Sequence, residues 1–212
     1  MISIRKFQTA DKEEVRKISC ATALLETHHG VFFDDDEILA DALTLYFTDY
    51  EPESCFVAVE DEEVVGYLIG TFDFAEMNKI FSKKILPGIL WKTLYKGTFL
   101  KKKHFIFAFN VLKSFLKGEF TSPDFTKQYP AILHINIKKN SRGQNAGKEL
   151  IENYLALLKS KNISGVHCGT MSERAKTFFT QCGFKVLFEG KRSYLRYCLN
   201  KDIPYYICGK LL

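Results

Sequence analysis

The sequence contains no hydrophobic run long enough to cross a membrane. A spanning helix needs about 20 consecutive apolar residues, and every apolar stretch of this 212-residue chain is interrupted before that length. Residues 1–7 alternate like a strand and lack the continuous apolar core of a signal peptide. We therefore expect neither a membrane span nor secretion.

Metal-ligand and redox spacings are also missing. No Cys-x-x-Cys pair occurs, and no group of Cys and His has ligand spacing. We expect no metal site, and we expect the cysteines to be buried thiols in a reducing, cytoplasmic environment. They are Cys20, Cys55, Cys168, Cys182, Cys198 and Cys208.

The residues that are present make up an ordinary globular composition. Hydrophobic residues account for 46% of the chain and charged residues for 26%, so intrinsic disorder is not expected. The length suits one domain with a full hydrophobic core. We expect residues 1–212 to form that single domain.

The most informative segment joins a short apolar strand to a helix through a basic turn. Residues 131–137 (AILHINI) are expected to form the strand and residues 141–147 (SRGQNAG) the turn. The helix that follows has apolar residues at i, i+3, i+4 and i+7 on one face. Its unpaired N–H groups and the positive end of its dipole would point at whatever lies above the strand, and phosphate suits such a position. The face consists of Gly147, Leu150, Ile151, Tyr154, Leu155 and Leu158.

A second segment repeats the order of strand, turn and helix. Residues 165–169 (GVHCG) are expected to form a strand, and Ser172 opens a helix that carries Ala175 and Phe178. The pair Gly183-Phe184 closes the segment.

Together these segments resemble the GNAT family of acetyl-CoA-dependent N-acetyltransferases. That family has Gln/Arg-x-x-Gly-x-Gly/Ala after its fourth strand, and here Arg142 and Gly147 fit the ends while Asn145 replaces the middle glycine. Its second pattern is Asn-x-x-Ala-x-x-Phe-Tyr-x-x-x-Gly-Phe. Ser172 stands at the Asn position and Phe179 at the Tyr position, and the other tokens match. The resemblance implies an α/β fold with a mixed sheet (α+β), the GNAT acyl-CoA N-acyltransferase fold.

The resemblance also implies a reaction, in which a neutral amine attacks the thioester of acetyl-CoA directly. In it, backbone groups of the fourth strand pair with the pantetheine arm, the Ile137 N–H polarises the thioester oxygen, and the turn binds the pyrophosphate. No metal takes part. The residues so assigned to acetyl-CoA are Ile135, Asn136, Ile137, Arg142, Gly143, Gln144, Asn145, Ala146, Gly147, Lys148, Ser172, Ala175 and Phe178.

His134 is the first candidate for the group that removes the amine proton. It shares one face of the alternating strand with Asn136, next to the expected reaction centre. The alternative is a histidine that is hydrogen bonded within the packed sheet, and His167 on the neighbouring strand is a second candidate. Many family members use the Tyr of the Phe-Tyr pair to protonate the leaving thiolate, which Phe179 cannot do. Tyr194 could replace it, the thiolate could leave unaided, or the protein could bind acetyl-CoA without turnover.

Several other elements are expected. Acidic residues Asp34, Asp35 and Asp36 precede a helix, either as a solvated cap or as a group that attracts a cation or an amine. The remaining predictions are a strand over residues 2–7, a helix capped by Thr9 that carries Val15, Ile18 and Leu25, a helix over 36–47, a hairpin of 55–59 and 64–70, closing strands near 186–188 and 194–199, and an apolar tail over 204–212.

A lysine-rich insertion, residues 73–129, is expected between the third and fourth strands. Ten lysines and no acidic residue lie between Lys79 and Lys117, so this stretch carries +10 and the rest of the chain −5. Its pattern predicts two amphipathic helices broken at residues 97–103. They could cap the sheet with solvated lysines, form a basic rim for an acidic acceptor or for coenzyme A, lie on an anionic membrane, or bind nucleic acid. The absence of Arg disfavours nucleic acid.

The sequence therefore predicts an acetyl-CoA-dependent N-acetyltransferase whose acceptor is the amine of a small molecule or a protein. The alternative is a non-catalytic protein of the same fold that binds coenzyme A or a partner through the basic helices. Exposed apolar faces on those helices could also be covered by a second subunit, as a homodimer.

Overall fold

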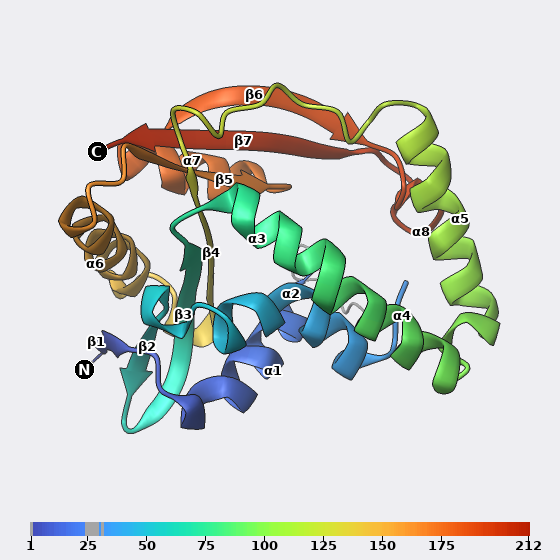
Figure 1. Ribbon diagram of the computed structural model, residues 1–212, viewed down its shortest axis with the longest axis horizontal. Coiled ribbons are helices and arrows are strands. Elements are labelled where there is room, and N and C mark those ends of the chain that lie inside the picture. The colour runs from blue at the N-terminus through green and yellow to red at the C-terminus, as the bar shows by residue number, and fades with distance from the viewer. Residues whose placement is uncertain (1, 24–29, 31) are drawn as a thin grey trace.

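The chain folds around a seven-stranded mixed sheet with the order β1-β2-β3-β4-β5-β7-β6. The computed structural model describes residues 2–23, 30 and 32–212 (Figure 1). All neighbouring strands are antiparallel except β4 and β5, which are parallel. This arrangement confirms the predicted α/β mixed sheet. The strands are β1 (Ser3–Lys6), β2 (Phe56–Glu60), β3 (Glu63–Thr71), β4 (Ala131–Ile137), β5 (Gly165–Thr170), β6 (Lys185–Arg192) and β7 (Ile203–Leu211).

Helices cover both faces of the sheet. They are α1 (Lys12–Thr22), α2 (Asp36–Asp49), α3 (Phe74–Ile80), α4 (Leu86–Tyr95), α5 (Lys102–Leu116), α6 (Ala146–Ser160), α7 (Glu173–Gln181) and α8 (Arg196–Leu199). Short 3-10 turns precede α1, β2, α5 and α6, and a π-helical segment, η4 (Phe81–Ile85), joins α3 to α4. Pro87 has no N–H to donate one turn back, which accounts for the widened helix at this point.

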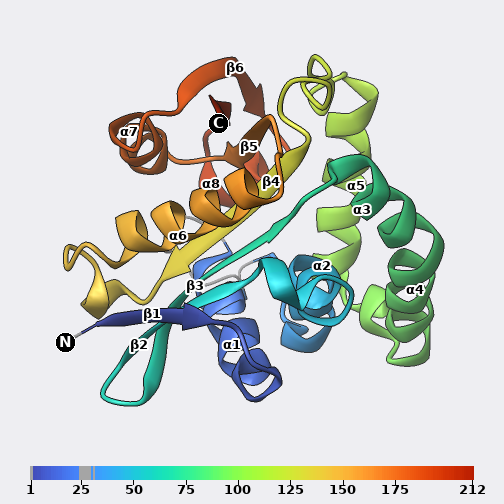
Figure 2. The ribbon, with the colours of Figure 1, turned by 60° about the vertical axis from the view of Figure 1, so that its left-hand side comes forward.

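Two hydrophobic cores lie on opposite faces of the sheet. The first core packs α6 against β3 and β4, and the second packs α1 and α2 against the other face (Figure 2). Tyr154 of α6 is fully buried, and its hydroxyl lies 2.9 Å from the carbonyl oxygens of both Thr71 and Ile132. A side chain at Gly70 would collide with the Tyr154 ring, so glycine is required there. These contacts fix α6, and therefore the turn before it, against β4.

The parallel strands β4 and β5 pair only at their beginnings. Their partners are Ala131 with Val166 and Ile132 with His167, after which the strands diverge. β4 continues to pair with β3 as far as Ile137. From Leu133 onward, the edge of β4 that faces β5 therefore has no strand partner among the described residues.

The helical insertion lies between β3 and β4, as predicted, and it packs against α2 through ion pairs. Glu37 pairs with Lys92 and Lys96, which lower its pKa to about 2, and Asp34 pairs with Lys101 and Lys103. The acidic start of α2 therefore includes the predicted cap, because Asp35 accepts a hydrogen bond from the Ile38 N–H, and its carboxylates also pair with lysines of the insertion. It neutralises part of the basic insertion within the molecule.

Asp41 of α2 connects three helices, and its removal is expected to destabilise the fold. Its carboxylate lies 2.6 Å from Arg16 of α1 and 2.6 Å from Lys92 of α4, and it is nearly buried. Asp41→Asn should lower the free energy of unfolding in urea by about 2 kcal/mol, because Arg16 and Lys92 each lose their most buried carboxylate partner. Glu76→Gln, which breaks the exposed pair with Lys79, should change it by less than about 0.5 kcal/mol. Equal effects of the two changes would contradict this assignment.

Three predictions of local structure were wrong. Residues 194–199 form a turn and α8 rather than a strand, and the expected tail is β7, which pairs with both β5 and β6. Thr9 does not cap a helix; Gln8 and Asp11 form a capping box around a 3-10 turn, and Asp11 also pairs with Arg5. Leu25, expected on the first helix, lies outside the described residues.

Candidate active site

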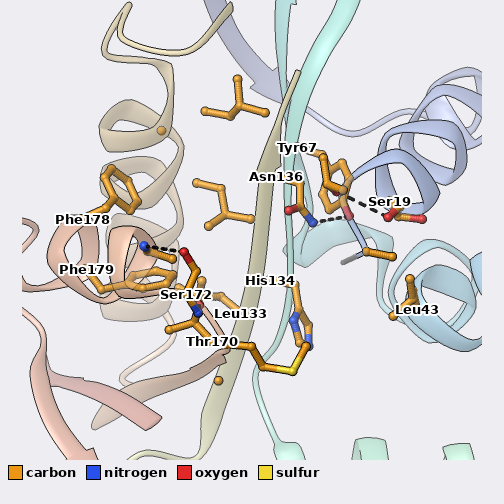
Figure 3. A pocket seen from close by; sticks show the side chains of 18 of the residues that line it. Ser19, Leu43, Tyr67, Leu133, His134, Asn136, Thr170, Ser172, Phe178 and Phe179 are labelled. Carbon is orange, nitrogen blue, oxygen red and sulfur yellow. Dashed lines mark hydrogen bonds between the residues drawn. The ribbon is translucent and has the colours of Figure 1, made fainter. Parts of the chain in front are cut away.

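A cavity of about 1510 Å³ runs through the sheet at the point where β4 and β5 diverge. Figure 3 shows Ser172, Phe178 and Phe179 on one side of β4 and Tyr67 and Asn136 on the other. The open edge of β4 joins these two halves. We call the half beside α6 and α7 the turn half, and the half beside α1 and α2 the histidine half.

The turn half is lined by backbone N–H groups at the start of α6. The 3-10 turn at Lys139–Ser141 uses the N–H groups of Ser141 and Arg142, and Lys148 and Glu149 donate to the Asn145 carbonyl. The backbone N–H groups of residues 143–147, which lie between the 3-10 turn and Lys148, donate no backbone hydrogen bond to any of the described residues. Five successive N–H donors without a backbone partner at the N-terminus of a 15-residue helix are the arrangement that suits an anion such as phosphate.

Basic side chains and a close backbone approach complete the turn half. Arg142, Lys148 and Arg174 line it, and Arg142 Nε donates to the carbonyl of Ile137 at 3.1 Å. Gly147 faces the end of β4. A Cβ atom there would lie 3.0 Å from the Phe178 ring and 3.2 Å from the Ile137 side chain, so any side chain would have to displace them.

Asn145 supplies the left-handed residue that the turn needs. Its φ is +68°, in the region that glycine favours and that Asn tolerates better than most residues. Asn145 thus adopts a conformation of the kind that the middle glycine of the family pattern would adopt freely.

This conformation leads to a prediction about stability. Asn145→Ala should lower the free energy of unfolding by about 1 kcal/mol, because alanine adopts a positive φ less readily than asparagine. Asn145→Gly should stay within about 0.5 kcal/mol of the wild type, since glycine adopts this conformation freely. Urea unfolding of the two variants measures the difference, and a less stable glycine variant would contradict it.

The open edge of β4 presents the backbone groups of alternate residues. Lys138 donates its N–H to the Val65 carbonyl of β3 at 2.8 Å, so Asn136, two residues earlier, also points its backbone groups at β3. Ile135 and Ile137 therefore point their N–H and C=O groups toward the gap between β4 and β5. A ligand with amide groups can extend the sheet along this edge, as an added strand does.

His134 lies in the histidine half with its ring toward the cavity. Solvent reaches the imidazole from the cavity, while the walls surround it on the other sides, including Phe47 in edge-on contact at 5.6 Å. Desolvation, with a smaller repulsion from His167, lowers the pKa of His134 to about 4. The ring is thus neutral at physiological pH and able to accept a proton.

Asn136 lies on the same side of β4 as His134. Its amide donates to the hydroxyl of Tyr67 at 2.8 Å, and Ser19 also bonds to that hydroxyl (Figure 3). Burial raises the pKa of Tyr67, which keeps the phenol neutral. The side chain of Asn136 therefore lines the histidine half rather than the turn half.

No hydroxyl stands at the position of the family's tyrosine. Phe179 is buried against Phe178 and Phe184. Tyr194 lines the cavity, and its hydroxyl donates to the sulfur of Met171 at 3.3 Å, a weak acceptor. Burial raises the pKa of Tyr194, so it carries its proton at neutral pH.

The structure brings nearly all the predicted site residues into one cavity. Gln144 is exposed and does not line it, and Ser172 lines it while capping α7 through a 3.4 Å bond from the Ala175 N–H. His167, the second candidate base, is not part of the lining; its ring bonds to the Tyr129 carbonyl and packs on Phe74. His28 and His29 lie outside the described residues. No group of metal ligands occurs in the described part of the chain.

Sequence reasoning missed other residues of the lining. They include Tyr67, Thr170, Arg192 and Tyr205, from β3, β5, β6 and β7. Of these four, only Tyr67 was indicated by the sequence, through the alternating pattern of β3. The sheet positions of β6 and β7 were not predicted, so their residues could not be placed in the cavity. None of the helices formed by the described residues is long and apolar enough to cross a membrane.

Comparison with known proteins agrees with this architecture. The sequence model of the acetyltransferase (GNAT) family matches residues 21–184, well over half of the chain. No curated protein matches the sequence. Among solved structures, the protein SsHAT is 20% identical with a TM-score of 0.70, and the match covers 99% of this chain and 98% of that one.

Two further solved structures illustrate the range of relatives. Polyamine N-acetyltransferase from Drosophila melanogaster, which forms N-acetylagmatine, is 14% identical with a TM-score of 0.64, and the match covers 100% of both chains. The putative acetyltransferase yncA from Salmonella typhimurium, solved with acetyl-CoA, is 12% identical with a TM-score of 0.60 and is matched over 94% of its length and 100% of this chain. At these identities the likeness concerns the fold.

Proposed function

The chain belongs to the GNAT family of acetyltransferases, and we propose that it transfers the acetyl group of acetyl-CoA to a primary amine of a small molecule or protein. One observation carries the proposal. The unpaired edge of β4 leads directly into five free N–H groups at the start of α6, within a cavity that also opens on the opposite face of the sheet.

The turn half fits coenzyme A in its chemistry. A diphosphate needs closely spaced N–H donors and cations, and the backbone of residues 143–147 supplies the first while Arg142, Lys148 and Arg174 supply the second. The pantetheine amides suit the open edge at Ile135 and Ile137. Acetyl-CoA contributes an activated acyl group on a thiol, and no metal is required.

The transfer needs a group that stabilises the thioester oxygen, a group that takes the amine proton and a group that protonates the leaving thiolate. The N–C bond forms as the C–S bond breaks, while the amine loses a proton and the thiolate gains one. The backbone N–H of Ile137 is proposed to stabilise the negative charge on the thioester oxygen. His134 is proposed to take the amine proton, directly or through water, since its ring is neutral and faces the cavity.

The leaving thiolate takes up a proton in the last step of the transfer. Tyr194 is the proposed donor, because it lines the cavity and, among the described residues, its hydroxyl is bound only by the thioether of Met171. A thiolate with a pKa of about 8.5 also leaves readily near neutral pH. Asn136 is assigned to the histidine half, where it would orient Tyr67 rather than bind acetyl-CoA.

Release of coenzyme A thiol from acetyl-CoA, measured against a panel of amines, tests the proposal. We expect thiol release that depends on the amine and that disappears in Gly147→Glu. Saturable binding of acetyl-CoA with no release for any amine would instead favour a non-catalytic coenzyme A-binding protein, which the phenylalanine at position 179 also permits.

A further inference from the structure

Arg192, the last residue of β6, is a buried cation in the wall of the cavity. It is 8% exposed, and its guanidinium carbon lies 3.8 Å from the centre of the Tyr205 ring and 4.3 Å from that of Phe120. Its Nε atom is buried and has no hydrogen-bond partner among the residues that the structure describes. No carboxylate of the described residues forms an ion pair with it.

A buried, unpaired guanidinium is costly unless an anion reaches it. The two rings hold the group in place by cation–π contact but accept no hydrogen bonds along its edge. Every charged side chain that lines the cavity is basic, and no described Asp or Glu takes part in the lining. The anion that pairs with Arg192 must therefore come from a ligand.

The strand register places Arg192 away from the turn half. Arg192 pairs with Ile203, so it shares a sheet face with Tyr205, which is two residues farther along β7. A Cβ on Gly169 of β5 would touch the Tyr205 hydroxyl, and Gly169 lies two residues after His167 on the same face. Since His167 is paired with Ile132, this is also the face of His134.

α7 packs on the opposite face. Its Glu173 and Lys176 contact Tyr206. Tyr206 follows Tyr205 in β7, so its side chain lies on the opposite face of the sheet from that of Tyr205. The basic residues proposed for coenzyme A phosphates, Arg142, Lys148 and Arg174, belong to the loop before α6, to α6 and to α7. Arg192 is thus available to the acceptor rather than to acetyl-CoA.

We propose that Arg192 binds a carboxylate on the acceptor, so that the substrate is an amine that also carries a carboxylate, such as an amino acid. This inference rests on the acetyl transfer proposed above and names its substrate class. It separates this chain from the polyamine and agmatine N-acetyltransferases among its structural neighbours, whose acceptors are cationic. The planar guanidinium can form two parallel hydrogen bonds to a carboxylate.

Matched acceptors test the assignment. Thiol release is measured for a panel of L-amino acids and for the corresponding amino-acid amides, which keep the amine and the side chain but lose the negative charge. We expect kcat/KM to be at least about tenfold higher for the best acids than for their amides. A preference for the amides, for polyamines, or for phosphoethanolamine over the amino acids would overturn the proposal.

Variants of Arg192 separate binding from a structural role. Arg192→Met should remove the preference for acids while leaving the KM for acetyl-CoA within about twofold, and Arg192→Lys should retain part of the preference. Because the charge is buried and unpaired, Arg192→Met should also raise the unfolding midpoint by about 2–4 °C. A lower midpoint together with an unchanged preference would show that Arg192 only supports the fold.

A binding measurement covers the case in which no amine is turned over. Calorimetry with N-acetyl amino acids and the matched N-acetyl amino-acid amides, in the presence of coenzyme A, tests the subsite without catalysis. Tighter binding of the acids, lost in Arg192→Met, would support the subsite even if the transferase proposal fails. Equal binding of acids and amides would refute it.

An independent observation concerns the outer surface of α4 and α5. Large apolar side chains face solvent here, with Trp91 72% exposed, Tyr95 85% and Phe105 68%. Both views place the two helices at the same end of the molecule (Figures 1 and 2). We call this the outer helical surface. Its other exposed apolar members are Leu86, Leu90, Leu94, Phe99, Leu100, Phe109, Leu112, Phe115 and Leu116.

The charge of this surface indicates what covers it. Residues 79–117 contain no acidic side chain, and Lys102 and Lys113 of α5 have no carboxylate partner in the described part of the chain. A symmetric contact with a second copy would bring like charges together. Nucleic acid would not use the apolar side chains. An anionic lipid surface meets both requirements, since it offers negative headgroups above an apolar interior.

We propose that the outer helical surface docks on anionic membranes. Trp91 is the sole tryptophan of the chain and reports on this surface directly. Its emission should shift to the blue with vesicles of phosphatidylcholine and phosphatidylserine, but not with phosphatidylcholine alone, and high salt should reverse the shift. No shift with anionic vesicles, or a shift with rising protein concentration alone, would overturn the proposal.

Charge-matched variants locate the contact. Lys102→Glu with Lys113→Glu should abolish the response to anionic vesicles. Lys159→Glu with Lys191→Glu changes the net charge equally on α6 and β6 and should preserve most of it. Equal losses in the two variants would show that only overall charge matters and would contradict docking through α4 and α5.

Discussion

Gly147→Glu is expected to raise the dissociation constant of acetyl-CoA by at least about 100-fold, or about 2.7 kcal/mol. The new Cβ would meet the Phe178 ring at 3.0 Å and the Ile137 side chain at 3.2 Å. The carboxylate would add a negative charge beside the free N–H groups of residues 143–147, where the proposed diphosphate lies. Calorimetric titration of acetyl-CoA measures the change.

Asn153→Glu is the matched control for that experiment. It adds the same charge to the exposed face of α6, away from the turn, and should leave the dissociation constant within about twofold. Circular dichroism checks that both variants are folded. Unchanged binding in a folded Gly147→Glu variant would show that acetyl-CoA does not use this turn.

His134→Gln is expected to lower kcat about 100-fold, because glutamine can hydrogen bond but cannot accept the amine proton. The KM for acetyl-CoA should change little, since His134 lies on the side of β4 opposite the turn half. His167→Gln is the control. It changes a buried histidine outside the cavity lining and should reduce stability rather than kcat.

The pH dependence follows from the lowered pKa of His134, about 4. Above that pH the ring is already neutral, so the rise of kcat/KM between pH 6 and 9 should follow the pKa of the acceptor amine. The folded pKa lies below the ordinary value of 6.5. The unfolded state therefore takes up the proton first, and stability falls as the pH drops from 6.5 toward 4.

His134→Gln should reduce this loss of stability in acid, which unfolding midpoints at a series of pH values would show. Direct titration of the ring by NMR gives the pKa itself. A kcat equal to that of the wild type, or a His134 pKa near 6.5, would contradict the role and the environment assigned to this residue.

The sequence predicted β4, the turn and α6 well because the signals there are local. The apolar run of residues 131–137 is strand β4 in full, and the helical face from Gly147 onward is buried as expected. Membership of the family followed from residues in fixed order within these segments. The gap between β4 and β5 could be inferred only through that resemblance, because no pattern in either strand shows where their pairing ends.

The parts that were missed depend on contacts between distant segments. Residues 204–212 were interpreted as a tail, and Pro204 argues against a central strand, yet β5 and β6 flank β7 on both sides and satisfy its backbone. The lysines of the insertion looked solvated, but acidic residues of α2 neutralise several of them across more than 50 positions of sequence. Arg192 gave no signal because its surroundings, Phe120 and Tyr205, come from other elements.

A crystal structure of the protein with acetyl-CoA tests the central claim most directly. We expect the diphosphate on the N–H groups of residues 143–147, the pantetheine arm along the edge of β4 at Ile135 and Ile137, and the acetyl group at the gap that leads to His134. Acetyl-CoA bound elsewhere, or a strand partner filling the edge of β4 in its place, would contradict the account.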